Sequence, residues 1–244
     1  MGLLDGKVAI ITGAARGQGA QEARLFVSEG ASVVITDVNP AGAGLAAELG
    51  ESVVFKQHDV SSEAEWKIIA DLARERFGKI DILVNNAGVA GWEPTQTVTA
   101  AQMRRYFDIH VMGALFGIQS IAPLMPKTGG SIVNIASTAA LGGIPSYVGY
   151  GTSKWALRGL SRYAARDLAE KNVRVNCVLP GGVETEMLNF GDEAKDIIDA
   201  SRSAVPMGRF GDVDEIAQVV LFLASDKSSY MTGGEIVADG GLMA

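Results

Sequence analysis

Residues 8–19 read VAIITGAARGQG, and this stretch decides the fold of the 244-residue chain. The run Val8–Thr12 is short and largely apolar, which is typical of a parallel strand buried on both faces. Gly13, Gly17 and Gly19 follow it, and a helical pattern begins at Gly17. Glycines at this spacing allow a tight turn and let backbone N–H groups approach a pyrophosphate at the amino end of the helix. The stretch therefore predicts the first strand–turn–helix unit of a dinucleotide-binding sheet.

The same alternation of apolar runs and helical patterns continues along the whole chain. Strands are expected at 8–12, 32–36, 53–57, 82–85, 131–135, 173–179 and 235–238, and helices near 17–29, 41–49, 62–77, 99–126, 150–171 and 213–224. This alternation predicts an α/β fold, a Rossmann-like, doubly wound parallel sheet of about seven strands with helices on both faces. We see no linker or repeat, so residues 1–244 are expected to form a single domain. Ser62, with Glu65 three residues later, predicts a capping box on the third helix.

Composition excludes several classes of protein. Hydrophobic residues make up 48% of the chain and charged residues 20%, which favours a large core over disorder. The net charge of −7 argues against a nucleic-acid partner, which needs a basic face. The single cysteine, Cys177, is expected to be a buried thiol and cannot form a disulfide within the chain. With no apolar signal core near residue 1, no apolar run of membrane-spanning length and no expected metal site, the sequence predicts a soluble, cytoplasmic protein without a membrane partner.

An acidic residue ends the second strand where a cofactor ribose is expected. Asp37, followed by Val38, can accept hydrogen bonds from the ribose hydroxyls, and its charge would repel a 2′-phosphate. Arg16 in the glycine loop favours NADP instead, because a guanidinium can pair with the 2′-phosphate. The short Asp37 side chain cannot move away, whereas Arg16 can turn into solvent. NAD is therefore expected rather than NADP, with Gln18 as a further contact in the same loop.

A tyrosine and a lysine four residues apart supply the chemistry. Tyr150 and Lys154 project from the same face of a predicted helix, one turn apart. A phenol titrates near pH ~10, and a nearby ammonium favours the phenolate, so we expect Lys154 to lower the pKa of Tyr150 towards neutrality. Ser137 follows the fifth strand, at the sheet edge where active sites of open α/β folds collect. Tyr147 has no lysine four residues after it and is expected to line a substrate pocket instead.

Together these motifs resemble the short, single-domain branch of the short-chain dehydrogenase/reductase family, over essentially the whole chain. The resemblance rests on the glycine loop at 12–19, Asp59-Val60, Asn85-Asn86-Ala87-Gly88, Ser137, the Tyr150/Lys154 pair, Pro180–Thr185, Thr232-Gly233 and Asp239-Gly240-Gly241. It implies that Asp59 and Val60 contact the adenine ring. It also implies that Asn86, Ala87 and Gly88 line the floor beneath the cofactor, and that Pro180, Gly181, Val183 and Thr185 hold the nicotinamide carboxamide.

The implied chemistry is hydride transfer between the nicotinamide and an alcohol or carbonyl carbon. Tyr150 would take the hydroxyl proton in oxidation and return it in reduction. Ser137 would hydrogen-bond the substrate oxygen, and Lys154 would bind the nicotinamide ribose. The chain departs from the family at His110, where an asparagine usually interrupts a helix and holds a water in a proton relay. Since imidazole can also relay protons, we expect His110 to replace that asparagine.

The resemblance also bears on substrate and assembly. It places a substrate lid at about 184–210, which contains Met187 and Leu188. Together with Trp92 and Tyr147, these residues predict an apolar pocket that can admit a bulky secondary alcohol or ketone. Packing within the lid explains the same residues equally well. The segment 154–160 is similar to that of hydroxysteroid dehydrogenases. Family members commonly form tetramers through helices near 99–126 and 150–171 and the last strand, so a homotetramer is expected. Two alternatives stay open: an NADPH-dependent ketoacyl-type reductase, and a dinucleotide-binding regulator without catalysis.

Overall fold

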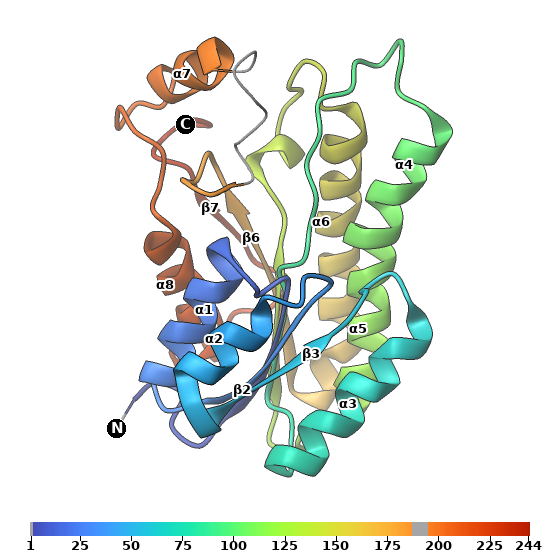
Figure 1. Ribbon diagram of the computed structural model, residues 1–244, viewed down its shortest axis with the longest axis vertical. Helices are drawn as coiled ribbons and strands as arrows, with labels where there is room; N and C mark the ends of the chain where they lie inside the picture. Colours follow the sequence, from blue (N-terminus) through green and yellow to red (C-terminus); the bar gives the residue numbers. More distant parts are fainter. Residues whose placement is uncertain (1, 187–194) are drawn as a thin grey trace.

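A single parallel sheet organises the chain in the computed structural model, which describes residues 2–186 and 195–244 (Figure 1). Within these residues the strands are β1 (Val8–Thr12), β2 (Ser32–Asp37), β3 (Val53–Gln57), β4 (Ile82–Asn85), β5 (Gly130–Ile135), β6 (Val173–Pro180) and β7 (Glu235–Ala238). Their order is β3-β2-β1-β4-β5-β6-β7, and every pairing is parallel. The predicted fold class is confirmed. The strand order reverses between β1 and β4, and ligands of open α/β sheets bind at such a point, beyond the carboxyl ends of the strands.

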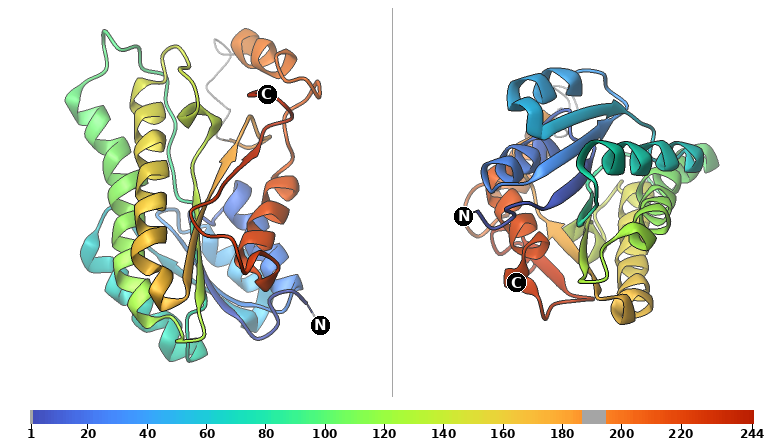
Figure 2. Two further views of the ribbon diagram at one scale, coloured as in Figure 1. Left: turned by 180° about the vertical axis from the view of Figure 1, so that it is seen from behind. Right: turned by 90° about the horizontal axis from the view of Figure 1, so that it is seen from below.

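Helices cover both faces of the sheet (Figure 2). They are α1 (Gly17–Ser28), α2 (Gly42–Leu49), α3 (Glu63–Phe77), α4 (Ala100–Phe107), α5 (Gly113–Ile121), α6 (Val148–Leu168), α7 (Lys195–Ser203) and α8 (Val213–Ala224). Successive side chains of a strand enter opposite cores, as the pleat requires. Ile11 packs with Phe26 on the side of α1 and α8, while Ile10 packs with Trp66 on the side of α3 and α5. Cys177 is buried, as expected.

The predicted capping box at Ser62 is wrong. Ser62 precedes α3, but its side chain makes no capping hydrogen bond. The Glu65 carboxylate instead accepts the Asp59 N–H at 2.9 Å, so it fixes the preceding turn. Capping boxes do form at Thr99, before α4, and at Asp212, before α8.

The helix Ala100–Leu124 corrects a second expectation. Among the described residues it is long and apolar enough, by length and composition, to cross a membrane, and 39% of its most apolar window is buried. Because α4 packs on α6 and α5 packs on α3 and β4, this segment is also part of the core of the domain. A π-helical turn, Asp108–Met112, separates α4 from α5, and the Gly113 N–H donates to the Asp108 carbonyl. Turns of this kind often mark functional sites.

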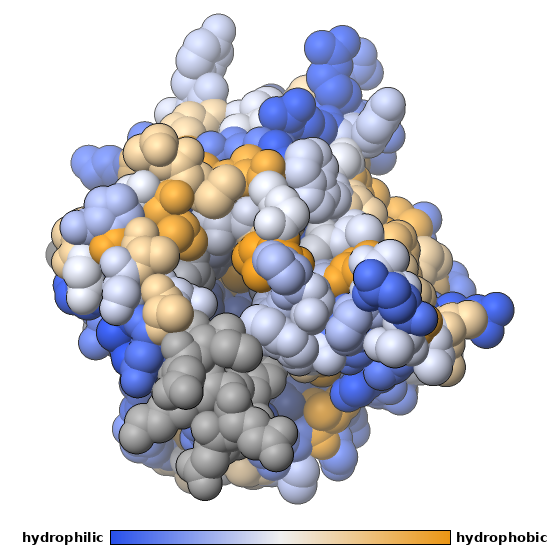
Figure 3. All heavy atoms as spheres, turned by 90° about the horizontal axis from the view of Figure 1, so that it is seen from above, coloured by the Kyte–Doolittle hydropathy of each residue, from blue (hydrophilic) through white to orange (hydrophobic). Residues whose placement is uncertain are grey.

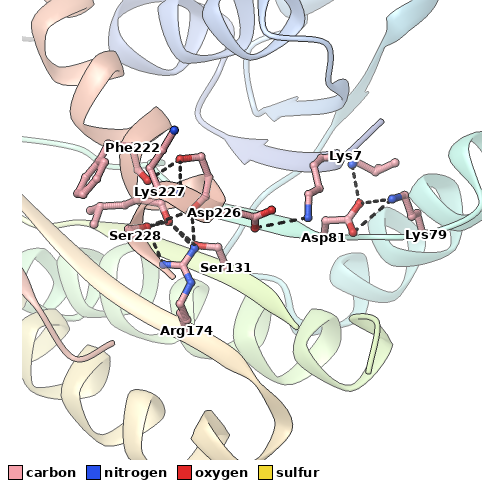
Figure 4. Close-up of polar contacts among 12 residues, drawn as sticks. Lys7, Lys79, Asp81, Ser131, Arg174, Phe222, Asp226, Lys227 and Ser228 are labelled. Atoms are coloured by element: carbon pink, nitrogen blue, oxygen red, sulfur yellow. Dashed lines mark hydrogen bonds and ion pairs between the residues drawn. The ribbon is translucent and has the colours of Figure 1, made fainter. Parts of the chain in front are cut away.

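Polar contacts at the amino-terminal ends of the strands hold neighbouring elements together (Figure 4). Arg174 on β6 donates to the carbonyls of Leu223 and Ser225 at 2.9 and 3.0 Å, which ties the end of α8 to the sheet. The Asp81 carboxylate accepts the Val8 N–H at 2.8 Å and so fixes the start of β1. These groups are occupied in holding the fold together. Active sites of open α/β sheets lie at the opposite end, beyond the carboxyl ends of the strands.

Glu22 on α1 makes stability depend on pH. Its side chain is fully buried, and neither carboxylate oxygen has a hydrogen-bond partner among the described residues. Burial raises the pKa of Glu22 from 4.5 to about 8. The folded state therefore binds the extra proton between these two pH values. The free energy of unfolding is therefore highest below the unfolded-state pKa of Glu22, 4.5. It falls by up to about 1.4 kcal/mol per pH unit as the pH rises from there towards about 8.

Replacing Glu22 by Met is expected to stabilise the protein, and more at about pH 8 than at about pH 5. Methionine fills a similar volume without a charge to bury. Urea unfolding of both proteins at the two pH values measures the difference in unfolding free energy. Glu22→Gln is the matched control, since it removes the titration but keeps a polar group. An advantage of Glu22→Met that is equal at both pH values would contradict this assignment.

Candidate active site

The glycine loop and the segment after β4 are held against each other. The Asn86 side-chain amide donates to the Thr12 carbonyl at 2.8 Å and to the Gly13 carbonyl at 3.0 Å. Gly13 has a φ of 66°, and a Cβ on it would lie 2.7 Å from the Ala87 Cα. Only glycine fits this close approach with this backbone. The contact places the floor residues 86–88 directly beside the predicted phosphate loop.

The amino end of α1 fits a dinucleotide. Arg16 precedes the helix without a capping side-chain bond, and no acidic residue occupies the first turn. The first N–H groups of the helix are thus left for an anion, which the helix dipole also favours. The side-chain oxygen of Gln18 is buried there without a partner among the described residues. This arrangement suits a pyrophosphate and a polar neighbour, as the sequence predicts.

The carboxylate of Asp37 is fixed beside this loop. It accepts the Ala15 N–H at 3.0 Å and the Asn39 N–H at 2.9 Å. Arg16 forms an ion pair with Glu186, at the beginning of the predicted lid. A guanidinium held by that carboxylate is less available to a phosphate. Sequence reasoning did not predict this ion pair, because Glu186 lies 170 residues from Arg16 in the chain.

The remaining predicted cofactor residues lie along the same edge. Val38 is exposed beside Asp37, and Asp59 is exposed next to the buried Val60. Pro180 ends β6, and a Cβ on Gly181 would lie 2.8 Å from the Asp239 side chain. Val183 is buried and bridges to Gly211. Thr185 lies beside the glycine loop. Its methyl group is 3.7 Å from the position that a Cβ would take on Gly17.

Tyr150, Lys154 and Ser137 come together where β5 meets α6. The Ser137 hydroxyl accepts the Ala139 N–H at 3.1 Å and lies near enough to the Tyr150 phenol to lower the pKa of that phenol. Lys154 is 4% exposed, and its ammonium donates to the Ile135 carbonyl at 2.7 Å. The ammonium lies 5.7 Å from the centre of the Tyr150 ring. The three residues thus form one cluster, with Ser137 just after β5 and with Tyr150 and Lys154 on α6.

The electrostatics of this cluster correct one prediction. Burial raises the pKa of Tyr150 above its ordinary value of 10, and only the hydrogen bond to Ser137 opposes this. Burial also lowers the pKa of Lys154, to about 8. The expected lowering of the Tyr150 pKa by Lys154 is absent, because the ammonium is directed at the Ile135 carbonyl while the phenolate would lose its hydration. The Tyr150 phenol is accordingly a proton donor at neutral pH.

Aromatic side chains lead from Tyr150 towards the surface. Tyr147 lies edge-on to Tyr150 at 5.6 Å between ring centres, and Trp92 lies edge-on to Tyr147 at 5.0 Å. Apolar groups gather around the middle of the face that carries these loops (Figure 3). Met187 and Leu188 lie outside the described residues. Sequence reasoning missed Glu93, whose two carboxylate oxygens accept the Tyr106 hydroxyl at 2.9 Å beside this wall.

His110 lies in the π-helical turn behind Tyr150. Its ring is buried and lies edge-on to the Tyr150 ring, at 5.7 Å between centres. The Val89 N–H donates to His110 Nε2 at 3.0 Å, and His110 Nδ1 lies 2.8 Å from the Ser153 hydroxyl oxygen. Burial, and then the Lys154 ammonium, hold the pKa of His110 well below 6.5. The imidazole is therefore neutral, with both nitrogens bonded to protein.

Known proteins resemble this chain along its whole length. A family model described as enoyl-(acyl carrier protein) reductase matches residues 13–243. The chain is 38% identical over 245 residues to the 3-alpha-(or 20-beta)-hydroxysteroid dehydrogenase of Mycobacterium tuberculosis, covering 100% of this chain and 92% of the relative. It is 39% identical over 246 residues to the 3-beta-hydroxysteroid dehydrogenase of Comamonas testosteroni, covering 98% and 97%. It is 38% identical over 248 residues to the NADP-dependent (R)-specific alcohol dehydrogenase of Lentilactobacillus kefiri, covering 99% and 98%.

Proposed function

The chain belongs to the short-chain dehydrogenase/reductase family of oxidoreductases, and from this premise we propose that it interconverts a secondary alcohol and a ketone with NAD(H). The observation that carries the proposal is the cluster of Tyr150, Ser137 and the buried Lys154, whose ammonium lies 5.7 Å from the centre of the Tyr150 ring. When bound, the nicotinamide supplies the hydride acceptor for oxidation and the donor for reduction. The protein's own residues supply the proton and orient the substrate.

Tyr150 is the acid in reduction and the base in oxidation. Because its pKa lies above 10, the phenol is protonated at neutral pH and is suited to give its proton to a developing alkoxide. Ser137 stabilises the same oxygen by a hydrogen bond. Lys154 is buried next to Gly88, and this position supports its proposed role of holding the nicotinamide ribose. Oxidation should accelerate as pH rises and the phenolate fraction grows.

Removing the Ser137 hydroxyl is expected to lower kcat by about 10²-fold, the effect of losing one preorganised donor. The alkaline rise of alcohol oxidation should also move to higher pH. The reason is that the bond to Ser137 lowers the Tyr150 pKa, so its loss leaves burial unopposed. The pH profile of kcat/KM for Ser137→Ala measures this shift, with Ser137→Thr as the control that keeps a hydroxyl. An unshifted profile in the alanine variant would argue against the assigned bond.

Two charges support NAD as the cofactor. The Asp37 carboxylate is held in place by two backbone N–H groups, where it would repel a 2′-phosphate. Arg16, which could bind that phosphate, is paired with Glu186. The relative from L. kefiri is NADP-dependent by its name, so the family as a whole does not decide the choice. In this chain the arrangement of Asp37 and Arg16 favours NAD.

An apolar, neutral substrate fits the walls of the site. Trp92 and Tyr147 present aromatic surface next to Tyr150, and Ile144 is exposed on the loop before α6. Two of the relatives are hydroxysteroid dehydrogenases by name, and such substrates are bulky and apolar. We include bulky cyclic secondary alcohols and hydroxysteroids in the proposed substrate class.

A homotetramer in the cytoplasm is part of the proposal. Trp155 and Tyr163 are exposed on α6, and Val237 is exposed on the edge strand β7. The apolar helix Ala100–Leu124 is only partly covered by its own chain. Apolar area of this kind is typical of a subunit interface. Sedimentation equilibrium measures the mass of the assembly. A monomer at micromolar concentration would contradict the proposed homotetramer.

A turnover screen tests the function. Purified protein is assayed with linear and cyclic secondary alcohols, hydroxysteroids and the matching ketones, each with NAD(H) and NADP(H), and with a 3-ketoacyl thioester. Turnover of neutral alcohols with NAD supports the proposal. Preference for the thioester with NADPH would establish the ketoacyl-type reductase instead. Binding of NADH without turnover of any compound would favour a non-catalytic regulator.

A further inference from the structure

His110 joins the cofactor floor to the catalytic helix through consecutive hydrogen bonds. The Val89 N–H can only donate, so His110 Nε2 is the acceptor of that bond. The neutral ring then carries its proton on Nδ1 and donates it to the Ser153 hydroxyl oxygen at 2.8 Å. The Ser153 hydroxyl in turn donates to the Tyr150 carbonyl at 2.7 Å. The path runs from the loop after β4 to the turn of α6 that carries Tyr150.

Close packing accompanies these bonds. A Cβ on Gly88 would lie 3.2 Å from His110 Nε2 and 3.5 Å from the Lys154 ammonium nitrogen. The imidazole and the catalytic lysine thus both pack against the floor residue Gly88. The π-helical turn Asp108–Met112 carries the ring to this position. A displacement of His110 would move both the cofactor floor and the helix turn of Tyr150.

The same contacts argue against a proton relay through the ring. A relay needs a nitrogen that can accept a proton while the other releases one. The lone pair of Nε2 is engaged by the Val89 N–H. Protonation would also place a cation in a buried site next to Lys154, which burial and that charge both oppose.

We infer that His110 is a positioning residue that fixes the nicotinamide floor relative to Tyr150, and that it passes no proton. This inference rests on the proposed function for its catalytic consequence, but its effect on cofactor binding does not require turnover. It replaces the relay role expected from the sequence. The two links of His110 can be broken separately, which makes the role testable.

The experiment compares His110→Phe, His110→Gln, Ser153→Ala and the double variant of His110→Phe with Ser153→Ala. Phenylalanine keeps a ring but loses both bonds, whereas glutamine can still accept the Val89 N–H. The alanine at 153 breaks only the link to Tyr150. NADH affinity is measured by fluorescence titration, kcat and the pH profile by steady-state kinetics, and folding by thermal unfolding.

A positioning role predicts that His110→Phe weakens NADH binding about tenfold and lowers kcat by about 10–100-fold, the loss expected for buried hydrogen bonds. His110→Gln should recover most of the NADH affinity. Ser153→Ala should bind NADH normally and lose about tenfold in kcat. The double variant should be no worse than His110→Phe, because both changes break one path. The pH profile should keep its position throughout.

A shifted pH profile in His110→Phe, with Ser153→Ala indistinguishable from the wild type, would overturn the inference in favour of a relay. Wild-type NADH affinity and kcat in a folded His110→Phe would overturn it as well. If His110→Phe does not fold, His110→Gln and Ser153→Ala decide. If the wild type turns over no substrate, the proposed function fails, while the NADH titrations still test the positioning role.

Discussion

Replacing Tyr150 by Phe is expected to lower kcat by about 10²–10⁴-fold while leaving NADH affinity nearly unchanged. The substitution removes the phenol oxygen, the group whose pKa Ser137 lowers. It keeps the ring that packs edge-on against Tyr147 and His110. The defect should therefore lie in proton transfer and not in the fold. Steady-state kinetics with NADH titration and thermal unfolding separate these possibilities.

Tyr147→Phe is the matched control for this result. Tyr147 is the adjacent tyrosine in the pocket, and burial raises its pKa to about 12. It has a glycine, Gly151, where Tyr150 has Lys154. Its loss should change kcat by no more than about fivefold, through substrate packing. A Tyr150→Phe enzyme that stays within about tenfold of the wild type would show that another group supplies the proton.

Replacing Asp37 by Ala is expected to shift the ratio of kcat/KM for NADP over NAD by about 10²-fold or more. Two unit charges ~4 Å apart interact by about 4 kcal/mol at an effective dielectric near ~20, so removing the carboxylate removes a large repulsion of the 2′-phosphate. The variant also loses the acceptor for the NAD ribose hydroxyls. Both effects act on the ratio in the same direction. Kinetics with each cofactor at a fixed alcohol concentration measure it.

Glu186→Gln provides the comparison for Asp37. It releases Arg16 from its ion pair, but both partners are mostly exposed, at 65% and 68%, so the gain with NADP should be about fivefold at most. The double variant should exceed either single change, since a freed guanidinium then meets no opposing carboxylate. If the ratio of kcat/KM for NADP over NAD in Asp37→Ala stays within about threefold of the wild-type ratio, Asp37 does not contribute to recognition of the ribose.

The fold and part of the site follow from short-range patterns. The run Val8–Thr12 and its glycine turn were identifiable because a buried parallel strand and a tight turn restrict residue type at each position. Tyr150 and Lys154 were identifiable because the helix period fixes their spacing. Helix α7 was not predicted, since it lies in the segment taken as a substrate lid. Local spacing therefore placed the main site residues but not every element around them.

Other features depend on contacts that no local pattern encodes. The ion pair of Arg16 joins residues 170 positions apart in the chain, and the two bonds of His110 join a loop to a helix distant in sequence. The direction of the Tyr150 pKa depends on how much water the folded chain excludes, which spacing alone does not give. The family resemblance suggested a relay at His110. We propose from its bonds that His110 is a positioning residue instead.

The most direct test of the account follows a deuterium label. A neutral secondary alcohol carrying deuterium on its carbinol carbon is incubated with the protein and NAD, and the reduced cofactor and the ketone are analysed by NMR. The account predicts one deuterium on the nicotinamide for each ketone formed, at a rate that falls by about 10²–10⁴-fold in Tyr150→Phe. Ketone without label in the cofactor, or an unchanged rate in Tyr150→Phe, would contradict it.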